Sequence, residues 1–396
     1  MISRYDIVLY GASGFTGVYV LKLLIEQQNQ ENVTFAIAGR NETRLKRLLE
    51  NLSQEMNKNL QNIPIIIADS YDESTLAAMA KQAKIIINVV GPYRLYGEVV
   101  VKAAVENGLY VVSACGWDSI PCDLGVNFLK NKFNGQLNHV ETFAQLNLGP
   151  AGYSANVGTY RTFTLRMINI LTDDLDKIRR SIMPEKLPIS SFPAPKRSSF
   201  WFNEKIDGWC LPFKGADKSV ITRSQYFEYK LHNVLPKSLY MYSYIYAIRQ
   251  LQLIKRYSDA IKENSVGNCY LVVNLLYVIL ITTLELPLQH ERASLRSKAS
   301  VIYLLVFGTG WTEKHSSFDD YSVKPVKEIV ARCVGPDAGY VTTSACVLAS
   351  ALSLLKDADK LPQGGVHTPT SAFKETGIYD RLEKYGVRFE IVDKFY

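Results

Sequence analysis

Cysteine is scarce in this sequence, with six residues among 396, and no two of them form a Cys-x-x-Cys pair. So few cysteines exclude a disulfide-based scaffold and favour a reducing compartment, and without paired spacing we expect no metal site. The chain also lacks an N-terminal run that is charged, then apolar, then small, so we expect synthesis in the cytosol and no secretion. Hydrophobic residues make up 47% and charged residues 21%, which excludes a disordered or fibrous protein. The length suits two or three domains.

Negative charge is scarce in residues 177–256, where fifteen Lys or Arg stand against five Asp or Glu. The same stretch is rich in aromatic residues: Phe200, Trp201, Phe202, Trp209, Phe213, Tyr240, Tyr242, Tyr244 and Tyr246. Basic and aromatic residues together are typical of a surface that binds nucleic acid or an anionic membrane. The alternative is a solvated basic face over an ordinary aromatic core. No nucleic-acid motif accompanies the stretch, so we expect no nucleic-acid partner.

The N-terminal third has the pattern of a nucleotide-binding α/β unit. The apolar run Tyr5–Tyr10 predicts a buried parallel strand, and Val18–Gln27 has the spacing of a helix. Between them lies a glycine loop whose candidate cofactor-binding residues are Gly11, Ala12, Ser13, Gly14, Phe15, Thr16 and Gly17. A strand, a glycine turn and a helix in this order let backbone amides approach a pyrophosphate at the helix N-terminus. The alternative is a glycine turn that only packs the helix on the strand.

The second predicted strand, 33–38, is followed by Arg40 and has no Asp or Glu between Asn32 and that arginine. An NAD site usually has an acid near this strand end to bind the ribose 2′-hydroxyl. A guanidinium matches a 2′-phosphate in charge and geometry, so we expect NADP rather than NAD. Alternatively, Arg40 stacks on the adenine or simply begins the next helix.

Two more strands are predicted at 63–68 and 84–90, followed by Asp69 and by Gly91-Pro92. Ligands of open parallel sheets lie beyond the carboxyl ends of the strands, so these residues join Gly11 and Arg40 along one edge. Asp69 is a candidate partner of the adenine amine, or else the N-cap of the next helix. Gly91 and Pro92 are expected to pass close to the nicotinamide ribose.

A fifth strand of the same sheet is expected at 109–114, leading into residues 115–125. Asp118 and Ser119 would then lie at the cofactor edge, where they are candidates to position a substrate or the nicotinamide amide. Alternatively, Asp118 caps the following helix.

Six separated blocks together carry a resemblance. They are GASGFTG (11–17), AGR (38–40), NVVGPYRLYGEVVVKAAVENG (88–108), GWDSIPCDLG (116–125), VGPDAGYV (334–341) and GGVHTPTSAF (364–373). In this order they resemble the saccharopine dehydrogenase-like oxidoreductase family. The resemblance implies a Rossmann-type doubly wound parallel sheet that binds NAD(P), a second α+β domain, and association with lipid droplets or membranes. The family is also similar to bacterial trans-acting enoyl reductases of glycolipid synthesis, and only distantly to true saccharopine dehydrogenase.

The sequence departs from the family pattern after Gly108. Members usually have a strand that ends in an Asp-x-x-Gly-Glu turn, then a helix, then the strand before the 116–125 block. Here LYVVSAC connects Gly108 directly to that block. A parallel crossover needs a dozen or more residues, so one whole crossover is absent. The absence puts catalysis in doubt more than folding or binding of the adenosine half.

The remainder, 127–396, is expected to form the second domain after a nucleotide-binding domain of residues 1–126. Strands are predicted at 140–148, 300–308 and 326–334, and helices at 158–170 and 341–355. None of the five histidines lies in a recognisable nucleophile frame, and His367, which lies in a family block, is the histidine to test first. Tyr226 and Lys230 fit Tyr-x-x-x-Lys by chance, because they lie outside the nucleotide-binding region.

One hydrophobic segment bears on localisation. Residues 264–284 contain no charge, and Cys269–Leu284 is mostly apolar. This is borderline for a bilayer span, and basic residues flank both sides, so we expect 264–288 to associate with one leaflet. The alternative is a buried core helix.

These features predict NADP-dependent hydride transfer on a lipidic substrate, at a lipid droplet or at a cytoplasmic, endoplasmic-reticulum or mitochondrial membrane surface. The alternative is a non-catalytic nucleotide-binding or structural protein of the lipid droplet. A third hypothesis, an atypical short-chain reductase, is disfavoured by the location of Tyr226 and Lys230. Association with a second copy stays open.

Overall fold

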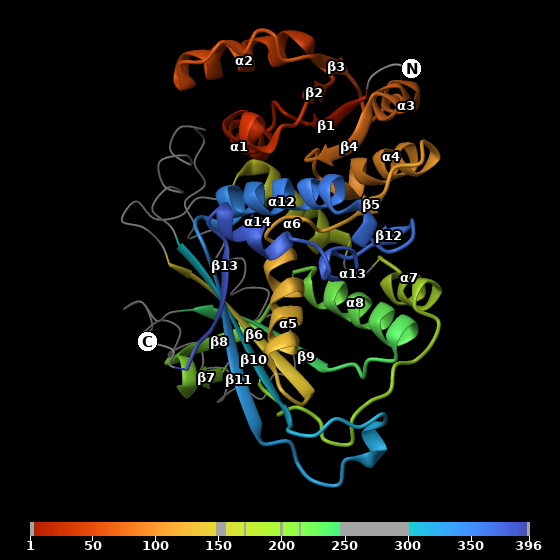
Figure 1. Ribbon diagram of the computed structural model, residues 1–396, viewed down its shortest axis with the longest axis vertical. Coiled ribbons are helices and arrows are strands. Elements are labelled where there is room, and N and C mark those ends of the chain that lie inside the picture. Colours follow the sequence, from red (N-terminus) through yellow and green to blue (C-terminus); the bar gives the residue numbers. More distant parts are fainter. Residues whose placement is uncertain are drawn as a thin grey trace. The chain divides into compact units, whose positions relative to one another are not determined.

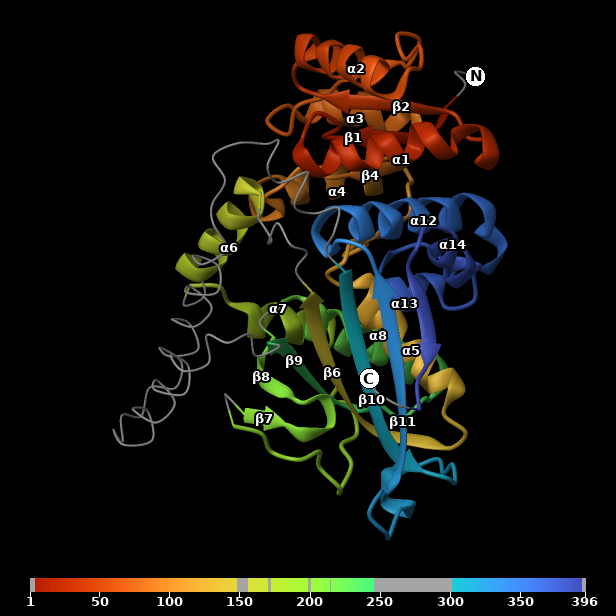
Figure 2. The same ribbon diagram turned by 90° about the vertical axis from the view of Figure 1, so that its left-hand side faces the viewer.

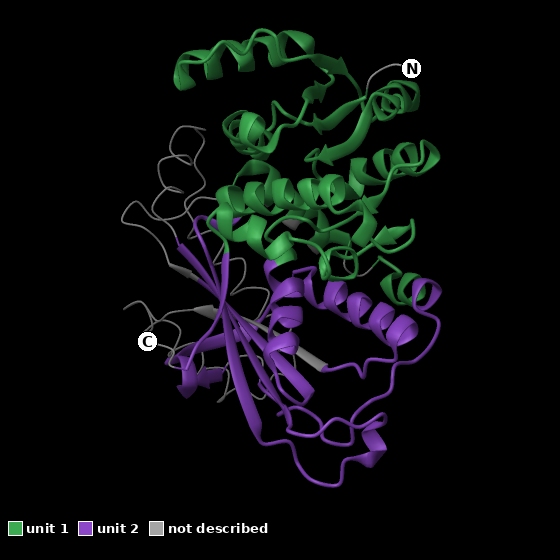
Figure 3. Ribbon diagram, in the orientation of Figure 1, with its two compact units in different colours: residues 1–120, 156–179, 339–387 green, residues 121–155, 180–338, 388–396 purple. Residues whose placement is uncertain are grey.

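A computed structural model describes residues 4–147, 156–169, 172–198, 201–213, 215–245 and 301–393. The chain divides into two units, drawn in different colours in Figure 3. Unit 1 comprises Met1–Ile120, Asn156–Arg179 and Gly339–Val387, and unit 2 comprises Pro121–Ala155, Arg180–Ala338 and Arg388–Tyr396. The single boundary expected after residue 126 differs from this division, because two later segments pack with the N-terminal one. The hydrophobic segment 264–288 lies outside the described residues.

Unit 1 contains a four-stranded parallel sheet in the order β3-β2-β1-β4 (Figure 1). Its strands are β1 (Tyr5–Tyr10), β2 (Phe35–Gly39), β3 (Ile65–Ile67) and β4 (Ala83–Asn88). Its connecting helices are α1 (Phe15–Glu31), α2 (Glu42–Met56), α3 (Glu73–Lys81) and α4 (Tyr93–Glu106). Successive side chains of a strand point to opposite faces. Ile7 and Leu9 therefore pack with α1 and α2, whereas Val8 and Tyr10 pack with α3 and α4. The predicted strand–helix alternation is confirmed.

The prediction of a fifth strand in this sheet is wrong. Strand β5 is only Val111–Val112, and it pairs in parallel with β12 (Val366–His367) in a separate two-stranded sheet. Only residues 107–119 connect α4 to the helix that begins at Ile120. This connection is too short for a strand beside β4, a crossover helix and a second strand. Asp118 and Ser119 therefore do not follow a strand of the four-stranded sheet.

Later parts of the chain complete unit 1. They form the helices α6 (Val157–Asn169), α12 (Thr343–Lys356), α13 (Pro369–Phe373) and α14 (Ile378–Lys384), and α7 (Leu175–Ile182) begins in this unit. Leu348 and Leu352 of α12 join the core that contains β1 and α1. Ala338–Lys356 is the one segment of the described chain with the length and hydropathy of a membrane span. Most of it is buried, as in the core helix of a globular unit.

Glu31, at the end of α1, joins three helical elements of unit 1. Its carboxylate pairs with Lys356 of α12 and Lys384 of α14, and it accepts a hydrogen bond of 2.9 Å from the Tyr385 hydroxyl. Burial opposes the charge of Glu31, but these donors outweigh it and lower its pKa from the ordinary 4.5 to about 2. The C-terminal helices are therefore held to α1 by a charged cluster that is 8% exposed at its centre.

Glu31→Gln is expected to destabilise the chain by up to about 3 kcal/mol at pH 7, since a pKa lowered by folding stabilises the native state. A depressed carboxyl pKa contributes fully above the unfolded value of 4.5, and the contribution disappears as pH falls towards about 2. Urea unfolding at pH 7 and pH 3 measures the difference, which should be much smaller at pH 3. Glu55→Gln is the control, because Glu55 is 58% exposed in its pair with Lys22 and should cost less than about 1 kcal/mol. Equal losses for both variants at pH 7 would contradict the role of Glu31.

Unit 2 contains a seven-stranded sheet in the order β13-β11-β10-β6-β9-β8-β7. Its strands are β6 (Gln136–Asn147), β7 (Trp201–Asn203), β8 (Gly208–Pro212), β9 (Ser238–Ile245), β10 (Val301–Trp311), β11 (Lys327–Gly335) and β13 (Arg388–Ile391). The long antiparallel pair of β10 and β11 is visible in Figure 2, and β6 pairs in parallel with β9. The strands predicted at 140–148, 300–308 and 326–334 are confirmed within the described residues.

Two helices of unit 2, α5 (Ile120–Lys132) and α8 (Asp217–His232), pack with each other and with the sheet. Buried Ser224 of α8 donates a hydrogen bond of 2.9 Å to Asp123 of α5. A Cβ on Gly308 of β10 would lie 2.4 Å from the side chain of Leu129 on α5, so a larger residue there would require that side chain to move. Tyr226 and Lys230 lie on α8, in unit 2, and Lys230 pairs with Glu185.

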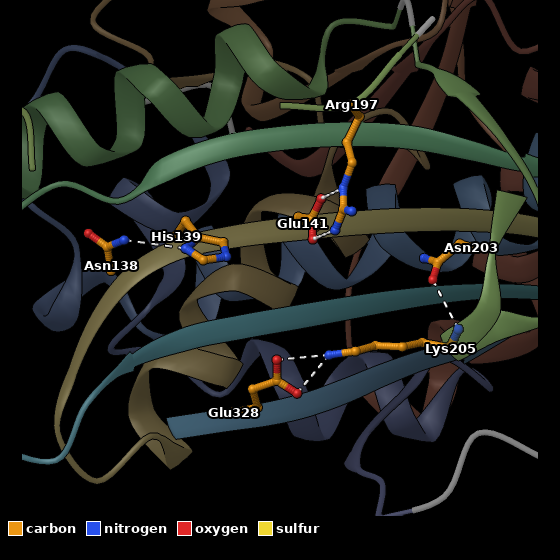
Figure 4. A network of polar contacts seen from close by, with 7 residues as sticks. All are labelled: Asn138, His139, Glu141, Arg197, Asn203, Lys205 and Glu328. Atoms are coloured by element: carbon orange, nitrogen blue, oxygen red, sulfur yellow. Dashed lines mark hydrogen bonds and ion pairs between the residues drawn. The ribbon is translucent and has the colours of Figure 1, made fainter. Parts of the chain in front are cut away.

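Ion pairs hold the segment before β8 on the sheet of unit 2, as Figure 4 shows. Arg197 donates two hydrogen bonds of 3.2 Å to Glu141 of β6, and its guanidinium lies 4.3 Å from the ring centre of Trp201. Lys205 binds both carboxylate oxygens of Glu328 on β11. In this part of 177–256, these basic and aromatic side chains therefore have structural partners. This favours the alternative of a basic face over an ordinary aromatic core.

Candidate functional site

The glycine loop of unit 1 depends on two glycines for its path. Gly11 has φ of +92°, which side chains other than glycine rarely adopt, and a Cβ there would lie 2.8 Å from Val90. A Cβ on Gly17 would lie 2.2 Å from the carbonyl oxygen of Gly11. These two residues therefore let α1 start immediately beside the loop. Ala12 is fully buried under the same turn.

The first turn of α1 has no acidic or capping group of its own. Gly14 is the N-cap in an extended conformation with φ of −77°, and no side chain caps the helix. Phe15 and Thr16 are the first helical residues, and the Phe15 ring packs edge-on against Tyr340 at 4.5 Å. A helix N-terminus without an acid or a side-chain cap is suited to bind phosphate through its amides. The loop therefore fits a dinucleotide diphosphate.

Two arginines lie at the edge of the sheet beside this loop. Arg40 directly follows β2 and is exposed, and Asn41, not Arg40, caps α2 by accepting from the Arg44 amide at 2.9 Å. The Arg44 guanidinium donates to the Ser13 carbonyl at 3.1 Å, which brings a second positive charge to the glycine loop. Arg40 was predicted as a cofactor-binding residue from the sequence, whereas Arg44 was not. Arg44 lies four residues after Arg40, at the start of a helix whose N-terminus faces the same edge. That position was the indication in the sequence that Arg44 could reach the site.

Asp69 follows β3 at the same edge, but it does not cap α3. The cap is Asp72, which accepts from the Ser74 amide at 3.0 Å, so the N-cap alternative for Asp69 is wrong. Asp69 instead accepts from the Tyr71 amide at 3.1 Å. Tyr71 is 75% exposed, and its ring packs edge-on against Tyr96 at 5.7 Å. This exposed aromatic pair beside the edge was not anticipated from the sequence.

Gly91 and Pro92 follow β4, and Pro92 is the N-cap of α4. A Cβ on Gly91 would meet nothing within 4 Å, so this position is open. Tyr93 donates a hydrogen bond of 2.8 Å to the Asn88 carbonyl, and desolvation raises the pKa of Tyr93 to about 12. The phenol therefore stays protonated at neutral pH, next to the expected nicotinamide end of the site.

Asp118 and Ser119 lie in a loop that α12 positions. The Trp117 amide donates to the Thr343 hydroxyl at 3.2 Å. Ser119 is fully buried, and its hydroxyl has no hydrogen-bond partner among the residues that the structure describes. The side chain of Asp118 is exposed. Desolvation by nearby protein disfavours its charged form and raises its pKa to about 6, and the positive charge of Arg166 on α6 partly offsets this rise. The two groups are next to each other and differ in access to solvent.

His367 is held by its own surroundings. Its ring stacks on Tyr110 with centres 5.0 Å apart. Its Nε2 lies 2.9 Å from the Gln363 carbonyl and its Nδ1 lies 3.4 Å from the Ser371 hydroxyl. Because both ring nitrogens have partners, His367 is suited to hold β12 beside β5. No group of three or more His, Cys, Asp or Glu side chains placed to bind a metal occurs in the described part of the chain.

Comparison with known proteins decides the family. Residues 7–137 match the model of the saccharopine dehydrogenase NADP binding domain. A Caenorhabditis elegans relative, "Lipid droplet localized protein", is 41% identical over 437 residues and covers 100% of both chains. The Bos taurus and Homo sapiens proteins named "Saccharopine dehydrogenase-like oxidoreductase" are each 30% identical, over 98% of this chain and 97% of theirs. The chain belongs to the saccharopine dehydrogenase-like oxidoreductases.

As a member of this family, the chain has an NADP-binding domain, which agrees with the position of Arg40. Saccharopine dehydrogenase (L-Glu forming) from Saccharomyces cerevisiae has a similar fold, with a TM-score of 0.50 at 13% identity over 98% of this chain and 100% of that one. The trans-acting enoyl reductase of Mycobacterium leprae is 33% identical over 151 residues, which cover 31% of this chain and 35% of its own.

The C. elegans alignment also bears on the short connection after α4 in this oxidoreductase. It spans 437 positions against 396 residues here, so about 41 of its positions have no residue in this chain. A strand and a crossover helix would fill a gap of that order.

Proposed function

We propose that this saccharopine dehydrogenase-like oxidoreductase binds NADPH in unit 1 and catalyses hydride transfer on a lipidic substrate at a lipid-droplet or membrane surface. The observation that carries the proposal is the uncapped N-terminus of α1, with Arg40 and Arg44 at the same edge of the sheet. The names of the C. elegans and M. leprae relatives support the lipid surface and the reductive chemistry.

Different residues of this edge would bind different parts of the cofactor. Backbone amides from Gly11 to Gly17 would hold the diphosphate, as expected from the helix N-terminus. Arg40, assisted by Arg44, would hold the 2′-phosphate, because a guanidinium matches phosphate in charge and shape. Asp69 would accept from the adenine amine, and Gly91 and Pro92 would border the nicotinamide ribose. The bound nicotinamide supplies the hydride.

Asp118 is the residue that we assign to proton transfer. A general acid works best when its pKa lies near the operating pH, and that of Asp118 is raised to about 6. Its exposed carboxyl has access to a substrate, whereas the buried Ser119 hydroxyl would position the loop. Tyr93 donates its one hydroxyl proton to the Asn88 carbonyl, so at the nicotinamide end of the site its oxygen would act as an acceptor.

Asp118→Asn is expected to lower turnover by about 100-fold or more while NADPH affinity changes less than about threefold, because the amide fits the site but cannot transfer a proton. NADPH oxidation with fractionated lipid extracts measures turnover, and fluorescence titration measures affinity. In the unsubstituted chain, activity should fall as pH rises through about 6, because the general acid then loses its proton. Asp72→Asn is the matched control, since Asp72 caps α3 and should affect neither value. Full activity of Asp118→Asn would contradict the assignment.

A second candidate is a nucleotide-binding protein of the lipid droplet without catalytic activity. It is favoured by the short connection after α4 and by the two-residue β5. The same assay separates the two: NADPH binding with no turnover in any lipid fraction supports the second candidate.

A further inference from the structure

Helix α7 has an apolar face that is exposed along its whole length. Leu175, Ile178 and Ile182 are 44%, 54% and 43% exposed, and no residue of the helix is buried. Their spacing of three and four residues places them on one side of the helix. Large apolar side chains in a contiguous exposed row mark a contact surface, whereas single ones are ordinary.

The rest of α7 is basic. Lys177, Arg179 and Arg180 stand against the single acid Asp176, which pairs with Arg179 at 3.0 Å. The helix is therefore strongly amphipathic and carries a net positive charge. Apolar residues on one side and cations on the other are typical of helices that lie in the plane of an anionic lipid surface.

Exposed apolar residues also flank α7 in the sequence. Ile168, near the end of α6, is 69% exposed, and Ile189, seven residues after the helix, is 84% exposed. Elsewhere in the described part of 177–256, several cations and aromatic residues have internal partners. Arg197 binds Glu141, and Trp201 packs on Phe143 in the sheet of unit 2. Helix α7 combines three exposed apolar side chains on one side with three cations over eight residues.

We propose that α7 is a lipid-contact helix, with Leu175, Ile178 and Ile182 inserted among the acyl chains and the basic residues at anionic headgroups. This inference rests on the lipid-surface part of the proposed function. A single short amphipathic helix binds lipid weakly and reversibly, so α7 acts together with at least one further lipid contact. The occupant of the apolar face is a lipid monolayer or leaflet, for which the positive charge selects anionic headgroups.

The test places an environment-sensitive fluorophore on the full-length Ile178→Cys variant and mixes it with vesicles of phosphatidylcholine and phosphatidylserine. We expect a blue shift, and quenching by lipids brominated on the acyl chain. Val326→Cys is the matched control, since Val326 is 82% exposed, apolar and far from α7 in the sequence, and its label should not respond. The unsubstituted chain treated with the same reagent gives the background from native cysteines.

Charge and apolar variants provide a second readout. Arg179→Glu with Arg180→Glu should weaken binding to anionic vesicles by at least about 30-fold, because each basic residue near the surface contributes about 1 kcal/mol, with little change on neutral vesicles. Ile178→Asp should weaken both. These positions are exposed, so the variants should keep the melting temperature of the unsubstituted chain.

Four outcomes would overturn the inference. A label at residue 178 that stays aqueous while the chain floats with vesicles places the lipid contact elsewhere and leaves the proposed function intact. Shielding of the label without lipid, dependent on protein concentration, assigns the face to a second copy of the chain. Shielding without lipid at every concentration assigns it to another segment of the same chain. If the unsubstituted chain does not float with vesicles at all, both this inference and the lipid-surface part of the proposed function fail. NADPH titration still tests the cofactor site separately.

Discussion

Gly14→Asp is expected to reduce NADPH affinity by at least about 100-fold while the chain remains folded. Gly14 has φ of −77°, and a Cβ there would lie 3.1 Å from the Gly11 carbonyl, which needs only a small adjustment. Asp is also a preferred N-cap, so its carboxylate would accept from the first-turn amides that the diphosphate needs. Loss of two charge-assisted hydrogen bonds, each worth about 1.5–3 kcal/mol, accounts for the size of the effect before repulsion is added.

Fluorescence titration with NADPH measures this affinity, and thermal unfolding checks the fold. Gly14→Ser is the matched control, since serine caps the helix without a charge and should cause a smaller loss. The melting temperature of Gly14→Asp should equal or exceed that of the unsubstituted chain. Near-normal NADPH affinity in a folded Gly14→Asp variant would mean that the amides of α1 do not hold the diphosphate.

Arg40→Ala is expected to weaken NADPH binding by about 10- to 100-fold and to leave NADH binding nearly unchanged, because only NADPH carries the 2′-phosphate. Arg44→Ala should cost less, since the Arg44 guanidinium already donates to Ser13 in the glycine loop. A combined variant should bind the two nucleotides about equally.

Arg47→Ala is the control for loss of charge. Arg47 is an exposed arginine of the same helix, α2, with no carboxylate partner among the described residues, and its loss removes the same charge from the same element. Its effect on the ratio of NADPH to NADH affinity should be less than about twofold. If Arg47→Ala changes the ratio as much as Arg40→Ala, the preference arises from the general positive potential and not from a specific phosphate contact.

The four-stranded part of unit 1 could be predicted because each of its strands and turns is encoded by a short, contiguous stretch of sequence. Tyr5–Tyr10 was predicted as a strand and forms β1 with the same bounds. Buried parallel strands are continuous apolar runs, and the glycines that follow β1 are required by backbone geometry at Gly11 and by close approach at Gly17. The carboxyl ends of parallel strands share one edge, so candidate residues could be placed together without knowledge of the second unit.

Other features depend on partners distant in sequence. Residues 109–114 have the composition of a buried strand, but pairing is decided by 366–367, more than 250 residues later. The assignment of α6 and α12 to unit 1 depends on contacts such as those of Leu348 in the core. Between Asp69 and Asp72, both preferred cap residues, only the three-dimensional path of the chain selects the cap of α3.

Titration calorimetry of NADPH and NADH into the full-length chain, with Arg40→Ala measured alongside, tests most directly whether unit 1 binds NADPH through Arg40. We expect one NADPH site per chain, at least about tenfold tighter than NADH, and a preference that falls by about 10- to 100-fold in Arg40→Ala. Absence of heat with either nucleotide in folded protein, or equal affinities in the unsubstituted chain, would contradict it.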